Sequence, residues 1–112
     1  MTSHVTTHVL DGVTGCPARG LSVTLEQRGA RGWSRLASGE TDADGRVADL
    51  GPSALPVGRY RIGFDTGAWF AAEGRPTFYP EVQICFELAD EATHYHVPLL
   101  LSPFAYSTYR GS

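Results

Sequence analysis

The sequence predicts an all-β domain, an antiparallel β-sandwich of two four-stranded sheets with one short helix. Hydrophobic and polar residues alternate through most of the chain, which is the period of half-buried strands. Glycine, proline and aspartate separate these segments at short intervals, as turns require. The chain has 112 residues, 42% of them hydrophobic, and this is enough to form one core. We therefore assign residues 1–112 to a single domain.

Eight segments show the strand pattern. In the second of them, Leu21, Val23 and Leu25 point to one side and polar residues point to the other. The third and fourth flank the sequence Asp-Ala-Asp-Gly at residues 42–45, a turn whose glycine supplies a positive φ. We expect strands at residues 4–11, 20–28, 32–41, 45–50, 58–66, 81–89, 94–102 and 104–111.

One segment breaks this alternation. Residues 67–73 are mostly helix formers and are followed by a Gly-Arg-Pro sequence, so we expect a two-turn helix there. The last two predicted strands are rich in apolar residues, which makes an exposed sheet edge unfavourable. We therefore expect these strands to pair with another subunit.

Composition excludes several classes of protein. A net charge of −3 argues against a nucleic-acid partner, which would need a basic face. There is no apolar run long enough to span a membrane and no signal-peptide pattern. Cys16 and Cys85 lack the neighbours of a metal or nucleophile motif, so we interpret them as free thiols in a reducing cytoplasm. Charged residues make up only 19% of the chain, which favours self-association.

Histidines are the first candidates for chemistry. Strand alternation places His94 and His96 on one face of a late strand, and it places His8 on one face of the first strand. A histidine flanked by apolar residues is most often a packed core residue, but imidazole is also the best proton acceptor near pH 7. Metal binding is the rival use. Zinc needs three or four supported ligands, and His8 is the only evident third ligand here.

Arg46 and Ser112 are the other candidates. Arg46 follows the Asp-Gly turn, where it either balances the nearby aspartates or clamps an anion or a carbonyl oxygen with its planar guanidinium. Ser112 has no G-x-S-x-G context and is held by the chain on one side only. We therefore expect Ser112 to donate a hydrogen bond rather than to act as a nucleophile in a triad.

Several motifs together point to a family. They are THVLDGVTGCPARGLSV, DADGR, GRYRIGFDTGAWF, FYPEV and HYHVPLLLSPFAYSTYRGS, which ends in the tetrapeptide YRGS. Over essentially the whole chain these blocks resemble the transthyretin-related family and, within it, the branch of 5-hydroxyisourate hydrolases. The closing YRGS is the most specific mark, because it separates the enzymes from the hormone-carrying transthyretins.

The resemblance implies a transthyretin-like fold and a set of site residues. His8, Arg46, His96 and Ser112 are expected to be catalytic. Substrate is expected to contact His8, Arg46, Tyr109, Arg110, Gly111 and Ser112. No metal and no cofactor are implied. His4 and His94 are expected to support the site or the structure, and either His8 or His96 is expected to be the base. In the family the site lies where two dimers meet in a homotetramer, so the tail should be packed at a subunit interface.

The activity implied is hydrolysis of 5-hydroxyisourate to 2-oxo-4-hydroxy-4-carboxy-5-ureidoimidazoline in urate catabolism, by a soluble cytoplasmic enzyme that binds neither nucleic acid nor membrane. The alternative is a non-enzymatic carrier that holds small aromatic ligands in the channel between dimers. A passive apolar channel has no need of His8, Arg46, His96 or the YRGS tail, so these residues favour the enzyme.

Overall fold

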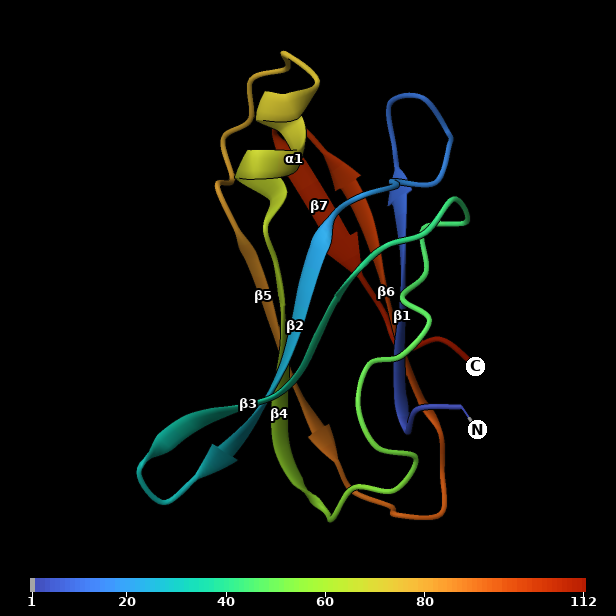
Figure 1. The fold of residues 1–112 in the computed structure, drawn as a ribbon, viewed down its shortest axis with the longest axis vertical. Helices are drawn as coiled ribbons and strands as arrows, with labels where there is room; N and C mark the ends of the chain where they lie inside the picture. The colour runs from blue at the N-terminus through green and yellow to red at the C-terminus, as the bar shows by residue number, and fades with distance from the viewer. Residues whose placement is uncertain (1) are drawn as a thin grey trace.

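Two β-sheets face each other in the computed structural model, which describes residues 2–112 (Figure 1). The first sheet has the strand order β1-β6-β7 and the second has the order β3-β2-β4-β5. The strands are β1 (Val5–Asp11), β2 (Ser22–Gly29), β3 (Gly32–Glu40), β4 (Gly58–Phe64), β5 (Val82–Leu88), β6 (Tyr95–Ser102) and β7 (Ala105–Thr108). A single helix, α1 (Thr66–Ala72), follows β4. The predicted fold class, a β-sandwich with one short helix, is confirmed.

The core lies between the sheets and follows the predicted alternation. Tyr60, Ile62 and Phe64 of β4 are fully buried, as are Val5 and Val9 of β1. The residues that alternate with them point outward and are only partly buried. Thr6 and His8 of β1 therefore share the outer face of the first sheet, whereas Thr7 is buried.

The expected strand at residues 45–50 is absent from the described chain. This segment contributes one bridge, between Arg46 and His8, and otherwise runs as an irregular loop beside β1 (Figure 1). Gly45 explains why: its φ is +78°, and its backbone approaches the Val9 carbonyl so closely that any side chain would collide with it. The first sheet consequently has three strands instead of four. Its β1–β6 pair is parallel rather than antiparallel, because the two strands are joined by most of the chain and not by a hairpin.

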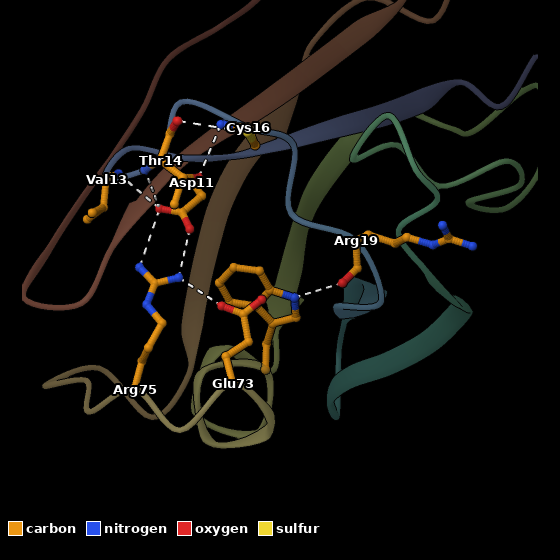
Figure 2. Close-up of polar contacts among 8 residues, drawn as sticks. Asp11, Val13, Thr14, Cys16, Arg19, Glu73 and Arg75 are labelled. Carbon is orange, nitrogen blue, oxygen red and sulfur yellow. Dashed lines mark hydrogen bonds and ion pairs between the residues drawn. The ribbon is translucent and has the colours of Figure 1, made fainter.

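An ion pair joins the segment after helix α1 to the C-terminal end of β1 (Figure 2). Asp11, the last residue of β1, accepts a 2.7 Å hydrogen bond from Arg75, which follows α1. The same carboxylate accepts the backbone N–H of Val13, and the Trp69 indole N–H donates to the Arg19 carbonyl. No helix within residues 2–112 is long and apolar enough to cross a membrane.

Candidate active site

The parallel pairing of β1 with β6 builds the centre of the site. Thr6 lies directly opposite His96, so both side chains point to the outer face of the sheet. His94 is two residues before His96, and it reaches the same face. The Thr6 hydroxyl oxygen lies 2.8 Å from His96 Nδ1 and 2.8 Å from His94 Nε2. One hydroxyl group thus joins two imidazole rings.

The turn at residues 42–46 brings Arg46 to this face. The Asp42 carboxylate accepts backbone N–H groups from Asp44 and Arg46, at 2.8 and 3.0 Å. These hydrogen bonds, with that from Arg46 the stronger influence, lower the pKa of Asp42, so the carboxylate stays ionised and keeps the turn closed. The turn is tied to β1 because Val9 donates its N–H to the Gly45 carbonyl at 2.8 Å. Arg46 therefore stands beside His8, its bridge partner.

The C-terminal tail closes the site from the other side. Gly111 forms an isolated bridge with His96, donating its N–H to the His96 carbonyl at 2.8 Å. A Cβ atom at position 111 would lie only 2.5 Å from His96 Cδ2, so the tail can lie this close to the imidazole only because residue 111 is glycine. Ser112 follows directly, and it lines the same surface hollow as Arg46 and His96.

These elements surround a hollow of about 340 Å³ on the outer face of the first sheet. It is lined by residues of the N-terminal segment, β1, the loop after β3, the start of β6 and the tail: Thr2, Thr6, Thr7, Arg46, Val47, His94, His96 and Ser112. The structure therefore brings together three of the four predicted catalytic residues, Arg46, His96 and Ser112. His8 lies half-buried at the margin, beside Arg46.

The surroundings of His96 keep its ring neutral at pH 7. Burial lowers the pKa of His96 below its usual value of 6.5, and the charges of Arg46, His8 and His94 lower it further. A hydrogen bond with the Thr6 backbone raises the pKa of His96, but this effect is outweighed. Because Nδ1 is engaged by Thr6, Nε2 is the ring nitrogen left to accept a proton from water in the hollow.

Two histidines outside the predicted catalytic set have clear contacts. His4 is buried, accepts the Leu55 N–H at Nδ1, and holds the Thr93 carbonyl at 2.7 Å through Nε2. This arrangement fits the structural role expected for it. His94 is exposed and contacts the site through Thr6. Sequence reasoning missed Thr6, although its position two residues before His8 on the same strand face was a usable signal.

Tyr109 and Arg110 lie in a neighbouring hollow of about 290 Å³, together with Phe86 and Ile84 of β5. The Arg110 guanidinium sits 4.5 Å from the centre of the Tyr95 ring. His96 borders both hollows. The predicted substrate contacts of Tyr109 and Arg110 thus remain predictions. Within residues 2–112, no group of three histidine, cysteine or acidic side chains is arranged to hold a metal ion.

The fold and the candidate site together define a class of protein: a two-sheet β-sandwich with histidines, an arginine and a serine around a hollow on the outer face of one sheet. The chain belongs to the HIUase/Transthyretin family, whose model matches residues 5–111. It is 49% identical over 106 residues to the 5-hydroxyisourate hydrolase of Salmonella dublin, covering 94% of this chain and 78% of that protein.

Solved structures of both family branches resemble this chain. The 5-hydroxyisourate hydrolase of Klebsiella pneumoniae is 44% identical, with a TM-score of 0.86 and coverage of 96% of this chain and 98% of that one. Transthyretin from Sparus aurata is 35% identical, with a TM-score of 0.89 and coverage of 96% and 95%. The backbone is thus shared by both branches and cannot distinguish them, so the assignment depends on identity and on the site residues.

Proposed function

We infer that this protein hydrolyses 5-hydroxyisourate, opening its six-membered ring in the catabolism of urate. The observation that carries this inference is the meeting of a neutral histidine, an arginine and the tail serine around one hollow, in a chain that is 49% identical to a protein of that name. Transthyretin-like carriage of aromatic ligands is not favoured, because this hollow is lined mainly by polar and titratable side chains.

The residues divide the chemistry between them. His96 Nε2 takes a proton from water as the water attacks the carbonyl carbon, and the lowered pKa of His96 leaves that nitrogen free at pH 7. Arg46 holds the carbonyl oxygen as negative charge develops on it. The ring C–N bond then breaks, and its nitrogen receives a proton. His8, beside Arg46, orients the substrate or the water.

The tail completes the substrate site in this proposal. Ser112 donates a hydrogen bond to the substrate within the hollow, and Gly111 leaves the close backbone approach to His96 open. Tyr109 and Arg110 contact substrate once the neighbouring subunit is in place. Tyr109 is 59% exposed in a single chain, so it has surface to offer a ligand or a partner.

We propose a homotetramer, a dimer of dimers, for the assembly. β7 is an edge strand with all four residues exposed, and Phe104, Tyr106 and Leu100 add exposed apolar surface around it. The opposite edge, β1, is partly covered by Arg46 and Pro17. We therefore expect two subunits to make their first contact through their β7 strands. Residues 1–112 act as one hydrolase domain in the cytoplasm, where Cys16 and Cys85, both exposed thiols, would stay reduced.

An assay on freshly generated 5-hydroxyisourate tests the function. We expect the purified protein to accelerate the loss of its ultraviolet absorbance, and His96→Ala to reduce kcat by at least about 100-fold with an unchanged melting temperature. Saturable binding of thyroxine without turnover would instead identify a carrier. Wild-type-like turnover by His96→Ala would remove His96 from the mechanism.

A further inference from the structure

The Thr6 hydroxyl occupies a position that the hydrolytic mechanism above does not use. Its oxygen lies 2.8 Å from a ring nitrogen of His96 and 2.8 Å from a ring nitrogen of His94. The geometry is set by strand register, since Thr6 is opposite His96 and His94 precedes it by two residues on the same face. His96 is half-buried and His94 is exposed, so the hydroxyl connects an inner ring to an outer one.

Because the Thr6 hydroxyl has a single proton to donate, the position of the proton on His96 depends on its position on His94. A threonine hydroxyl has one proton to donate, and a neutral imidazole has one donor and one acceptor nitrogen. When His96 Nδ1–H donates to Thr6, the hydroxyl donates to His94 Nε2, and His96 Nε2 is a bare base. When His94 Nε2–H donates to Thr6, the hydroxyl donates to His96 Nδ1, and His96 Nε2 carries a proton. The hydroxyl therefore ties the form of His96 to that of His94.

The positive charges around His96 favour proton transfer from His96 through Thr6 to His94. Once His96 Nε2 has taken a proton from water, an imidazolium stands near Arg46 and His8, both of which disfavour positive charge there. The Nδ1 proton of His96 can pass to Thr6 Oγ1 while the hydroxyl proton passes to His94 Nε2. No proton is lost: His96 becomes neutral with a proton on Nε2, and the exposed His94 carries the positive charge into solvent.

We propose that Thr6 and His94 are positioning residues for His96, which hold its base form at rest and take over its positive charge after it has accepted a proton. The proposal rests on the inferred hydrolase function. The relay also runs back: as Nε2–H passes to the departing ring nitrogen, His94 returns a proton to Thr6 Oγ1 and the hydroxyl proton passes to His96 Nδ1, so His96 ends in the base form with which it began.

Single substitutions test the relay kinetically. Thr6→Val keeps the shape and removes the hydroxyl, and we expect kcat to fall about tenfold, equivalent to about 1.4 kcal/mol, with KM within about twofold. Thr6→Ser should restore kcat to within about threefold of wild type. Thr24→Val, on the outer face of the second sheet, is the matched control and should change neither constant. Wild-type kcat in Thr6→Val would overturn the proposal.

A double-mutant cycle and a pH profile separate a relay from a structural disturbance. His94→Ala should lower kcat about as much as Thr6→Val, and combining them should cost no more than either alone. The acid limb of kcat/KM should stay in place in Thr6→Val, because the hydrogen bond that raises the pKa of His96 comes from the Thr6 backbone, which the substitution keeps. It should move to higher pH in His94→Ala, because a nearby positive charge is gone. Additive losses, or the same shift of the acid limb in both variants, would contradict the relay.

A measurement without substrate keeps the relay distinct from the activity. In ¹⁵N-histidine NMR of the wild-type protein at pH 8, His96 should be found as the Nδ1–H form, and Thr6→Val should shift it toward the Nε2–H form. Failure of the wild-type protein to act on 5-hydroxyisourate would reject the proposed function but leave this result to judge the coupling. The same His96 form in both proteins would reject the coupling.

Discussion

The outer faces of the two sheets are both polar and both hollowed, but they arrange their charges differently. On the second sheet the hollow is the larger, about 460 Å³ against 340 Å³. One of its two arginines, Arg61, is neutralised by Glu26 at 2.6 Å and lies 4.3 Å from the centre of the Trp33 ring. On the first sheet Arg46 stands among histidines, and within residues 2–112 it forms no ion pair with an acidic side chain.

This difference shows why size is a poor guide to the site. A guanidinium held by a carboxylate and an aromatic ring has its interactions already satisfied and serves the structure. A guanidinium beside imidazole rings lowers the pKa of His96 and is not paired with a carboxylate among the described residues, so it can hold an oxygen of the substrate. We therefore propose that the chemistry takes place in the smaller hollow, which, unlike the hollow on the second sheet, is bordered by the C-terminal tail.

Removing the C-terminal tail should have the largest effect on the candidate site of the first sheet. Deleting residues 109–112 takes away Ser112 and the bridge between Gly111 and His96 but leaves the β6–β7 ladder, which ends at Thr108. We expect turnover of 5-hydroxyisourate to fall by at least about 1,000-fold, since base and substrate both lose their positioning. Melting temperature should change little.

Sedimentation of the same truncated sample links this loss to assembly. The full chain should sediment as a tetramer, and the truncated chain should keep the β7 edge that we expect to pair first. A truncated protein that turns over within tenfold of wild type would show that the tail is dispensable. An active full-length monomer would show that the site is complete in one chain.

Neutralising one arginine on each face should give opposite outcomes. Arg46→Gln should lower kcat/KM by about 100-fold, which is the usual cost of removing an oxyanion donor, and leave the melting temperature unchanged. Arg61→Gln should leave kcat/KM within about twofold and lower the melting temperature by only a few degrees, because exposed ion pairs contribute little. Equal kinetic losses from the two variants would contradict the division between the faces.

The sequence could predict the sandwich because its information is local. Alternation such as that of Tyr60, Ile62 and Phe64 records which side of a strand is buried, and the structure confirms it. The missed features depend on pairing across the chain. The loss of the strand at residues 45–50 follows from a backbone approach of Gly45 to Val9, 36 positions away in sequence. No pattern within residues 45–50 encodes that contact.

The candidate site, like the fold, has some features that local sequence predicts and others that depend on pairing between distant segments. Family motifs predict His8, Arg46, His96 and Ser112 as site residues, because each stands in a recognisable block. Thr6 belongs to no such block, and its contacts with His94 and His96 exist only because β1 and β6 pair in parallel at one register. If β1 were shifted by one residue relative to β6, the Thr6 side chain would point into the core.

The smallest expected effect comes from one methyl group, and it tests whether the tail really sets the position of His96. Gly111→Ala would place a Cβ atom 2.5 Å from His96 Cδ2 and 3.2 Å from Cγ, so the ring or the tail must move. We expect kcat to fall about tenfold, because displacing a base by part of an ångström already weakens catalysis. Gly63→Ala is the matched control, since it lies on the outer face of the second sheet with nothing within 4 Å of its added Cβ. That variant should keep kcat and, by removing a flexible glycine from a strand, leave stability equal or slightly higher. Steady-state kinetics on both proteins decide the matter: if Gly111→Ala matches Gly63→Ala, the contact between the tail and His96 does not position the base.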